Sequence, residues 1–483
     1  MKILIATHNK YKLKEIKQNA NSKIDFISLD DLEDNNVVIE DGYTFNQNAY
    51  KKAKYYFDLY GLPTLADDSG LVVKALKGDP GIYSSRYGGI EGDDANNNKK
   101  LLTEMKNSKN RSAYYYCSFC YIDAVGKVHY FSGKINGQIA IEEKGKNGFG
   151  YDSLFIPYKY QKTFGELNPE IKSKISHRSK ALVKFFKYIS RVKISNTKII
   201  KYNIKKIFKT SKIKVIKRLI GGLSNYNYLV DINNELYVYR IPGSFGDFFV
   251  NRKIEIDNLT ILSKLKFCFL PEYFNIYNGH KISRYIDGFD LDVLEEKDYE
   301  ECATILRKLH SYEDTFSNNY EPFKRLEKFE KNLKDLNFQI DPMYYSIKKF
   351  LFKYKLYLES QKLRMSHGDS QVRNFIKGDK IYLMDYEFTG NNDPVYDIAC
   401  YANRNLDEGY KLLQIYYKKD IDNDKILRFY LWRLFQNLQW YNVAVFKELK
   451  GLSKELKIDF MTVSKNYLKK AEIIIAKIKE KNL

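Results

Sequence analysis

Residues 366–387 read SHGDSQVRNFIKGDKIYLMDYE, and this stretch decides the fold of the second half of the chain. Asp369 precedes Asn374 by five residues, and Asp385 follows Asn374 by eleven, at the end of the apolar run IYLM. An Asp, an Asn and a further Asp after the next strand pair is the arrangement by which phosphotransferases hold Mg²⁺ and a hydroxyl acceptor beside ATP. We therefore expect Asp369 to accept the proton of the acceptor, and Asn374, Asp385 and the nearby Glu387 to bind Mg²⁺.

The sequence upstream of this stretch predicts a small β-rich lobe, followed by a larger helical one from about residue 248. Residues 226–232 and 235–241 read as strands joined by an Asn-Asn turn. Arg240 lies at the end of the second strand, where we expect a cation that binds phosphate, and Glu255 could pair with it. The other residues expected to bind ATP are Ser224 and Asn225 of a Gly-rich loop, and Tyr285 of a hinge over residues 283–287.

Residues 1–190 alternate short β-like runs with helical patterns, which indicates an α/β domain. The expected strands are KILIA at residues 2–6, residues 64–73 with an interruption at Ala-Asp-Asp-Ser-Gly, and a pair at residues 114–122 and 127–135. The expected helices cover residues 9–19 and 45–60.

Polar segments follow these elements, and each suits one part of a nucleoside triphosphate. Thr7, Asn9 and Lys12 come directly after the first strand, at a turn where free backbone N–H groups favour phosphate. Asp67 and Asp68 are adjacent carboxylates that could hold Mg²⁺ and activate water. Taken in isolation, such a pair is more simply an acidic turn.

A third polar segment offers groups that could bind a base. Residues 148–152 read GFGYD, in which an aromatic ring beside glycine can stack on a base and Asp152 can accept hydrogen bonds from base N–H groups. Lys172, His177 and Arg178 follow and can reach phosphate or base edges.

Taken together, residues 1–189 resemble the inosine triphosphate pyrophosphatase family. The resemblance is carried by the motifs Thr7-x-Asn-x-x-Lys-x-x-Glu, Thr44-Phe-x-x-Asn-Ala-x-x-Lys-Ala, Ala66-Asp-Asp-Ser-Gly, Pro80-Gly-Ile-Tyr-Ser-x-Arg-Tyr, Gly148-Phe-Gly-Tyr-Asp and Ile175-Ser-His-Arg. It implies hydrolysis of dITP, ITP or XTP to the monophosphate and pyrophosphate, and a homodimer formed through this domain.

The same resemblance implies the roles of individual residues. Asp68 would be the base that activates water and would also bind Mg²⁺, together with Glu40. The implied substrate contacts are Thr7, His8, Asn9, Lys10, Lys12, Lys52, Ser69, Phe149, Gly150, Tyr151, Asp152, Lys172, His177 and Arg178. The sequence departs from the family pattern at Gln47, where Glu is usual, and at Ser153, where Pro is typical.

Residues 200–483 resemble the choline kinase family, within the wider aminoglycoside phosphotransferase-like superfamily. The matching runs are GGLSNYNYLV, YVYRIPG, NRKIE, the His-Gly-Asp segment and MDYEFTGNNDPVYDIACY. This resemblance implies a two-lobed α+β kinase fold and transfer of the γ-phosphate of ATP to choline. Arg373 stands where the family usually has Gly, and nothing in the sequence explains it.

The acceptor pocket is predicted from the two Trp residues of the chain, Trp432 and Trp440. They lie eight residues apart and so share one helix face, with Tyr441 beside them. Aromatic faces hold a quaternary ammonium at ~0.5–2 kcal/mol per contact. In isolation the pattern is more simply a core stripe, but next to the phosphotransferase motif it favours a choline pocket.

Charge and composition bound the remaining possibilities. The chain has 483 residues and a net charge of +21, to which residues 191–220 contribute eleven bases and no acid. We place the domain boundaries at 1–190, 191–215 as a basic junction, and 216–483. For this junction we favour a connecting segment that includes the first helix and strand of the next domain. The alternative is an arm that binds nucleic acid.

Five Cys make no disulfide framework, and Cys117-x-x-Cys120 falls on a strand pattern that sends its thiols to opposite faces. The apolar run Ile3–Ala6 is too short for a signal peptide, and no stretch approaches the length of a membrane span. These observations predict a cytoplasmic enzyme. The alternatives are a kinase for ethanolamine, an aminoglycoside or another small hydroxyl acceptor, and a first domain that only senses nucleotides.

Overall fold

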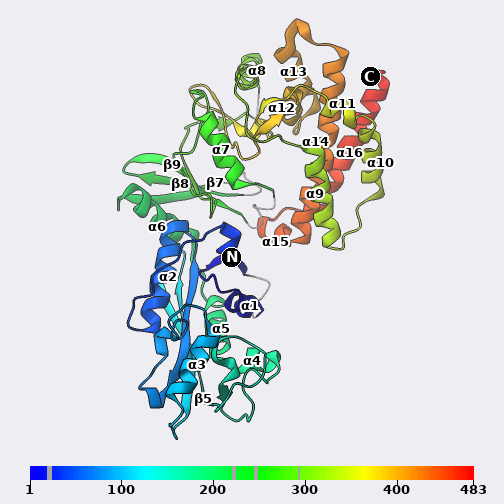
Figure 1. Ribbon diagram of the computed structural model, residues 1–483. Helices are drawn as coiled ribbons and strands as arrows, with labels where there is room; N and C mark the ends of the chain where they lie inside the picture. The colour runs from blue at the N-terminus through cyan, green and yellow to red at the C-terminus, as the bar shows by residue number, and fades with distance from the viewer. Residues whose placement is uncertain (19–23, 220–224, 244–248, 292–293) are drawn as a thin grey trace. The chain divides into compact units, whose positions relative to one another are not determined.

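The computed structural model describes residues 1–18, 24–219, 225–243, 249–291 and 294–483. The chain divides into two compact units, Met1–Val215 with Ile232–Asn234 and Ile216–Asp231 with Glu235–Leu483. Each unit has its own sheet (Figure 1). Each unit also has its own hydrophobic core. Within the described residues, no helix combines the length and the apolar character needed to cross a membrane.

The first unit is built on a mixed sheet in the order β2-β1-β3-β4-β5-β6. Strand β1 pairs in parallel with β2 and β3, and the remaining pairs are antiparallel. The strands are β1 (Lys2–Ile5), β2 (Asp25–Ser28), β3 (Thr64–Val73), β4 (Ser112–Ile122), β5 (Val128–Ile139) and β6 (Phe155–Pro157). The predicted α/β class is confirmed.

Strand β3 runs without a break through Ala-Asp-Asp-Ser-Gly, so the expected interruption is wrong. Its ten residues pair in register with β4, from Thr64 opposite Ile122 to Val73 opposite Ala113. Because successive side chains of a strand point to opposite faces, the two adjacent carboxylates of this motif cannot act side by side.

Helices cover both faces of this sheet. Ser118 of β4 donates to Asn46 of α2 (Phe45–Tyr60) at 2.6 Å. Its neighbours Cys117 and Phe119 point the other way and pack with Phe185 of α5 (His177–Ile189). The further helices of this unit are α1 (Lys10–Gln18), α3 (Asp94–Glu104), α4 (Pro169–Ile175) and α6 (Asn196–Phe208).

Helix α6 is formed by the basic junction and belongs to the first unit, whereas we expected it to open the next domain. Ile200 and Ile204 are fully buried. The ring of Tyr202 lies 6.3 Å from that of Phe57 on α2, and Lys206 pairs with Asp58 at 3.3 Å. The apolar stripe of the helix is therefore used for packing, and most of its lysines stay exposed.

The second unit begins with a sheet in the order β10-β11-β9-β8-β7. Its strands are β7 (Ile213–Leu219), β8 (Asn225–Ile232), β9 (Glu235–Pro242), β10 (Tyr273–Phe274) and β11 (Lys281–Arg284). Asn233 and Asn234 join β8 to β9 with φ of 56° and 69°, the left-handed pair of a two-residue hairpin. The predicted Asn-Asn turn is thus confirmed.

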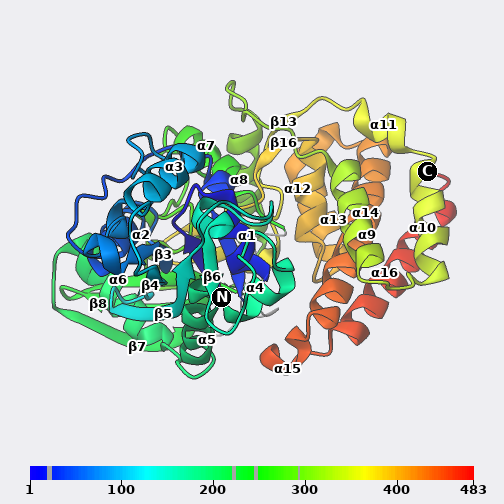
Figure 2. The same cartoon turned by 60° about the horizontal axis from the view of Figure 1, so that its bottom comes forward.

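The rest of this unit is mainly helical, which confirms the predicted two-lobed, kinase-like fold. Helices α9, α10, α14 and α16 lie side by side in both views (Figure 2). Short strands carry the phosphotransferase motif in two small sheets, β12-β14-β15 and β13-β16. The bounds are α7 (Arg252–Leu262), β12 (Phe289–Asp290), α8 (Glu296–His310), α9 (Pro322–Asp335), α10 (Pro342–Phe352), α11 (Lys355–Glu359), β13 (Arg364–Ser366), β14 (Phe375–Lys377), β15 (Ile381–Leu383), β16 (Gly390–Asn392), α12 (Pro394–Tyr401), α13 (Leu406–Tyr417), α14 (Asn423–Leu449), α15 (Leu452–Leu456) and α16 (Phe460–Glu480).

Candidate active sites

The turn between β1 and α1 brings a lysine to a buried carboxylate. Asn9 accepts from the backbone N–H groups of Tyr11 and Lys12, both at 3.0 Å, and so caps the helix. Thr7 accepts in turn from the N–H of Asn9 at 3.2 Å. This holds Lys12 where its Nζ lies 3.2 Å from Oδ2 of Asp67. Of the other predicted contacts, His8 hydrogen-bonds the carbonyl of Asn36, and Lys10 begins the helix and is exposed.

Asp67 is held between cations. Its side chain is fully buried, and besides Lys12 it meets Arg178 at 3.4 Å. Burial alone would raise the pKa of Asp67, but the two cations outweigh it and hold that pKa below its usual range. Asp67 is therefore ionised and serves as a counter-ion rather than as a base.

Asp68 faces the other side of the sheet, toward Lys52 and Glu40. Lys52 pairs with Glu40 at 2.8 Å, and its charge also acts on Asp68. Burial, opposed by Lys52 and aided by Glu40, raises the pKa of Asp68 above its usual value. Its Oδ2 is buried and has no hydrogen-bond partner within the described part of the chain. A basic, desolvated carboxylate with an unused oxygen is suited to taking a proton from water.

The donor set around Asp68 fits Mg²⁺. Carboxylate oxygens are the ligands that this ion prefers, and it usually keeps water and substrate phosphates as its other ligands. Asp68 contributes the unused oxygen, and Glu40 is half-buried beside it. Across the described residues, no three His, Cys, Asp or Glu side chains gather closely enough to enclose a metal. The ion would then depend on water and the triphosphate to complete its shell.

Aromatic rings and a buried lysine form the part of the site expected to bind a base. The ring of Phe149 stacks on that of Tyr11 with 5.2 Å between centres, and Nζ of Lys172 lies 4.7 Å from the Phe149 ring. Asp152 accepts from the N–H of Phe149 at 2.8 Å and from Lys172. Gly148 has a φ of 83°, and a Cβ there would lie 2.0 Å from Oδ2 of Asp152, so the turn requires glycine.

Arg178 and His177 begin α5 beside these groups. Arg178 donates to Ser69 at 2.8 Å and pairs with Glu15. His177 stacks on Tyr115 with 4.7 Å between ring centres, and its Nδ1 has no partner in the described chain. Burial, reinforced by Arg178 and Lys172, lowers the pKa of His177 well below its usual value. The imidazole is therefore neutral.

Gly150 and Tyr151, which were predicted to contact the substrate, form hydrogen bonds within the protein. The N–H of Gly150 donates to Asp94 at 2.7 Å, and the buried Tyr151 donates to the carbonyl of Ser84 at 2.9 Å. Both anchor the GFGYD turn to neighbouring segments. Sequence reasoning missed Tyr11 and Tyr115, whose rings orient Phe149 and His177.

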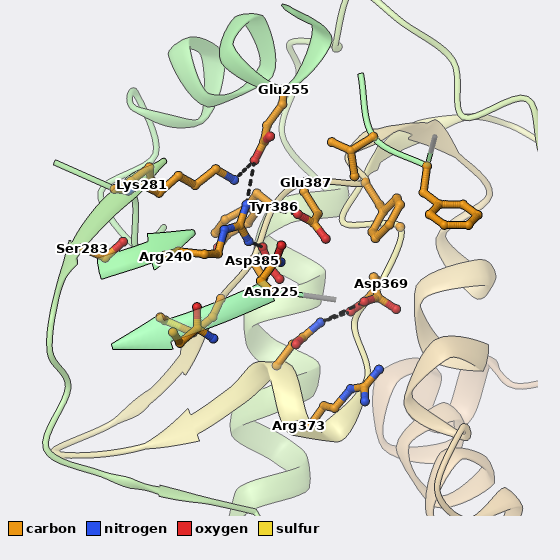
Figure 3. Close-up of a pocket in the computed structure, with 18 of the residues that line it drawn as sticks. Asn225, Arg240, Glu255, Lys281, Ser283, Asp369, Arg373, Asp385, Tyr386 and Glu387 are labelled. Carbon is orange, nitrogen blue, oxygen red and sulfur yellow. Dashed lines mark hydrogen bonds and ion pairs between the residues drawn. The ribbon is translucent and has the colours of Figure 1, made fainter. Parts of the chain in front are cut away.

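The second unit has a cavity of about 490 Å³ between its sheet and its helices (Figure 3). It brings together most of the residues predicted for phosphotransfer. Those that line it are Asn225, Arg240, Glu255, Tyr285, Asp369, Asn374, Asp385, Glu387 and Trp440. The predicted Gly-rich loop and Ser224 lie outside the described residues.

Asp397 holds the loop that carries Asp369. It accepts from the backbone N–H groups of His367 and Gly368 at 2.7 and 2.8 Å, and His310 of α8 hydrogen-bonds it at 3.0 Å. Gly368 has a φ of 77°, and a Cβ there would lie 2.2 Å from the carbonyl oxygen of Phe388. His310 is thus a buried support of this loop.

Asp369 is a buried carboxyl with a raised pKa. It accepts from the side chains of Gln371 and Asn374. Burial raises the pKa of Asp369 to about 7, against the opposing charge of Arg373. Arg373, which the sequence could not explain, therefore acts as a cation near the expected base, and both lie at the same end of the cavity (Figure 3). A carboxyl with this pKa is suited to accepting a hydroxyl proton near neutrality.

Arg240 gathers the carboxylates expected to bind metal. It forms ion pairs with Asp385 and, at 3.0 Å, with Glu387. Burial favours a higher pKa for Asp385, but Arg240 and Lys281 outweigh it and lower that pKa. The side chains of Asp385, Glu387 and Asn374 supply oxygens that fit Mg²⁺. Asp385 has a φ of 65°, a left-handed conformation that Asp tolerates better than most residues with a side chain.

The expected pair between Arg240 and Glu255 is present only at 3.8 Å, because another cation is closer. Lys281 of β11 lies opposite Arg240 in the strand register and forms an ion pair with Glu255 (Figure 3). Sequence reasoning missed Lys281. The available signal was a lysine at the start of the short strand KISR, which leads into the predicted hinge.

The structure separates the three aromatic residues that were predicted together. Trp440 is half-buried and lines the cavity. Trp432 is 1% exposed and its indole N–H donates to Asp393 at 2.8 Å. Tyr441 is also in the core and accepts from the N–H of Asp341 at 3.2 Å. Trp432 and Tyr441 are thus core residues. The 100° step from Trp440 turns Tyr441 away from the cavity, and Trp432, about two turns earlier on the helix, is covered by its packing in the core.

Comparison with known families agrees with the division of the chain. The family model described as "Ham1 family" matches residues 3–188, and that of choline/ethanolamine kinases matches residues 216–431. A dITP/XTP pyrophosphatase of Desulfotalea psychrophila is 44% identical over 181 residues, which are 37% of this chain and 81% of that protein. The chain belongs to the Ham1 family.

A second relative, the dITP/XTP pyrophosphatase of Geobacter sulfurreducens, is 44% identical over 184 residues, 38% of this chain and 92% of that protein. Among solved structures, the Ham1 protein of Staphylococcus aureus is 35% identical with a TM-score of 0.37, covering 39% of this chain and 98% of its own. Choline kinase LicA of Streptococcus pneumoniae is 24% identical with a TM-score of 0.48, and the match covers 57% of this chain and 97% of LicA.

Both departures of the Ham1 domain from its family pattern have local explanations. The side-chain oxygen of Gln47 accepts from the backbone N–H of Tyr43 at 2.7 Å. The backbone N–H of Gln47 donates to the hydroxyl of Thr44, the residue that caps α2. An amide oxygen suffices for this capping role. Ser153 donates to Glu143 at 2.7 Å, so it adds a hydrogen bond where Pro could not.

Proposed function

We propose that the Ham1 domain hydrolyses dITP, XTP and ITP to the nucleoside monophosphate and pyrophosphate. The observation that supports this most directly is the buried, unpartnered oxygen of Asp68 beside the Lys52–Glu40 pair. Asp68 would take the proton of a water that attacks the α-phosphorus. Lys12 and Lys52 would neutralise charge that develops on the pyrophosphate leaving group.

Glu40 and Asp68 would hold Mg²⁺, which lowers the pKa of bound water and neutralises phosphate oxygens. The base of the substrate would lie against Phe149, with Asp152 and Lys172 at its polar edge and the neutral His177 nearby. We also propose that the protein dimerises through this domain. This part of the proposal rests on the family resemblance.

The test is pyrophosphate release from dITP, XTP, dATP and dGTP by the full chain with Mg²⁺. We expect dITP and XTP to be hydrolysed at least about a hundredfold faster, since a site built to hydrogen-bond a given base edge rejects others strongly. Equal rates on all four nucleotides would contradict the proposal.

For the second unit, we propose transfer of the γ-phosphate of ATP to the hydroxyl of choline. Asp369 would accept the hydroxyl proton, and Arg240 would contact ATP phosphates. Asn374, Asp385 and Glu387 would hold Mg²⁺, which neutralises charge on the transferred phosphoryl group. The supporting observation is a cavity lined by both Asp369 and Trp440, where a reacting hydroxyl and an ammonium can lie together.

One experiment distinguishes choline from the other candidate acceptors: ATP consumption is measured in the presence of choline, ethanolamine or kanamycin. An aminoglycoside carries several positive charges and needs an acidic pocket. The cations Arg325, Arg373 and Lys447 line this cavity, which disfavours kanamycin. We expect choline to be preferred over ethanolamine, because its larger methylated ammonium makes more contact with aromatic faces. Preference for ethanolamine or kanamycin would overturn the proposal.

A further inference from the structure

Arg325 of helix α9 lies among three aromatic rings. Its guanidinium carbon is 5.0 Å from the centre of the Tyr320 ring, 5.6 Å from that of Phe329 and 4.8 Å from that of Phe388. All four residues line the cavity that contains Asp369. A cation surrounded by several aromatic faces is the arrangement by which proteins recognise quaternary ammonium groups. Here the cation belongs to the protein.

This cluster lies next to the expected catalytic base. A Cβ at Gly368 would lie 3.0 Å from Cε2 of Tyr320 and 2.2 Å from the carbonyl oxygen of Phe388. Tyr320 and Phe388 therefore border the turn that presents Asp369. Tyr320 also reaches Gln439, the neighbour of Trp440, at 3.4 Å. The rings around Arg325 are thus continuous with the place where an acceptor hydroxyl would react.

Arg325 is held in the cluster by few polar contacts. One nitrogen, Nη2, donates to the carbonyl of Phe249 at 3.0 Å. Its Nε is buried and has no hydrogen-bond partner, and no ion pair to it is found, within the residues that the structure describes. Among the described residues the contacts of the guanidinium are mainly with the three rings, so a second cation would compete with it for the same aromatic faces.

We propose that Arg325 is a specificity-determining residue of the acceptor site, because its guanidinium occupies the aromatic cluster that a cationic acceptor would need. This inference rests on the proposed phosphorylation of choline. It adds an electrostatic cost to the binding of choline, because the acceptor and Arg325 are both cations. A quaternary ammonium must displace the guanidinium or lie beside a like charge. A neutral alcohol of the same shape meets no such repulsion. The native enzyme should therefore prefer choline over its uncharged analogue only weakly.

The test compares kcat/KM for choline and for 3,3-dimethylbutan-1-ol, in which carbon replaces the ammonium nitrogen. In Arg325→Met we expect the choline-to-alcohol ratio to rise by at least about fivefold, the value of one cation–π contact, through a lower KM for choline. Lys324→Met is the matched control, since Lys324 is the preceding residue on α9 and is exposed. It should leave the ratio unchanged. A ratio that stays constant or falls in Arg325→Met would overturn the proposal.

Two further measurements keep this inference separate from the proposed function. Arg325→Gln retains a donor for Phe249 and serves if the Met variant does not fold. Calorimetric binding of tetramethylammonium requires no phosphorylation, and we expect it to be at least about fivefold tighter in either variant. If neither alcohol is phosphorylated but this tightening is found, the proposed reaction fails and the role of Arg325 stands. If choline is phosphorylated and neither variant binds tetramethylammonium more tightly, the proposed reaction stands and the role of Arg325 fails.

Discussion

Asp67 and Asp68 are adjacent on strand β3, yet they serve opposite faces of the sheet. Asp68 lies opposite Ser118, whose side chain reaches α2, and Asp67 lies opposite Phe119, which packs toward α5. Asp67 therefore meets Lys12 and Arg178, and Asp68 faces Lys52 and Glu40. Two carboxylates that look equivalent in the sequence have different surroundings.

Asp68→Asn should reduce dITP hydrolysis by at least about a hundredfold, because the amide cannot take the proton of the attacking water. Phosphorylation by the second unit should be unchanged. Asp67→Asn should act differently, since it removes the buried counter-ion of Lys12 and leaves Arg178 paired with Glu15 alone, which costs about 3–5 kcal/mol of stability. Pyrophosphate release and thermal unfolding of both variants test this, and full hydrolysis by Asp68→Asn would exclude it as the base.

Phe149→Ala should raise the KM for dITP by about 5- to 100-fold, because base stacking on an aromatic ring contributes about 1–3 kcal/mol. The ring is already oriented by stacking on Tyr11. Tyr158→Ala, at an exposed aromatic residue of the same unit, is the control and should leave the KM unchanged. Steady-state kinetics check both, and an unaltered KM in Phe149→Ala would place the base elsewhere.

His177 should make the first unit less stable in acid. Its pKa is lowered in the folded state by burial, with Arg178 and Lys172 adding to the effect, so the unfolded chain binds a proton that the folded chain does not. Stability contributed by the neutral form is present above the unfolded pKa, near 6.5, and is lost as the pH falls below it. The loss approaches about 1.4 kcal/mol per pH unit. His177→Gln should flatten the dependence of Tm on pH between about 5 and 6.5, and an identical slope would disprove this.

Asp369→Asn should abolish phosphotransfer and leave dITP hydrolysis intact. Asp397→Asn should instead disturb the position of the catalytic loop, because one carboxylate there serves the N–H groups of His367 and Gly368 and the ring of His310. We expect a loss of stability of about 1–3 kcal/mol with a partial loss of kcat. Equal kcat values for Asp397→Asn and the wild type would show that the loop is held in another way.

Trp440→Ala should raise the KM for choline by about 2- to 30-fold, the range expected from loss of one aromatic contact. Trp432→Phe is the informative control, because Trp432 does not line the cavity. The change removes the buried hydrogen bond to Asp393 and part of a buried ring, and should lower stability by at least about 1–3 kcal/mol without changing the KM. If Trp440→Ala leaves the KM for choline unchanged, the ammonium is bound elsewhere.

Local motifs brought most of their residues together in the two candidate sites, because these residues follow directly from strand ends and turns. The kinase motif from Asp369 to Asp385 needs only a loop and one strand pair to come together. The Asn-Asn hairpin and the helix over residues 45–60 were likewise readable from turn residues and periodicity. No long-range packing information was needed for these features.

Residues that depend on packing could not be read in the same way. Helix periodicity places Trp432 and Trp440 on one face but does not say which of them the neighbouring helices bury. Lys281 and Arg325 gain their roles from strand register and from ring positions that come from distant parts of the chain. The alternation of Asp67 and Asp68 was hidden because an acidic, Gly-containing run does not resemble a continuous strand.

The packing of helix α6 decides where the first enzyme can be cut from the second. Ending the chain at residue 190, near where the family resemblance stops, would remove Ile200 and Ile204. It would also remove Tyr202, which covers Phe57 and the Gly126 turn. A soluble, separate hydrolase should therefore extend to about residue 210, with the lysine-rich segment retained as part of its fold. What the sequence presents as a tether is, for the first unit, its last structural helix.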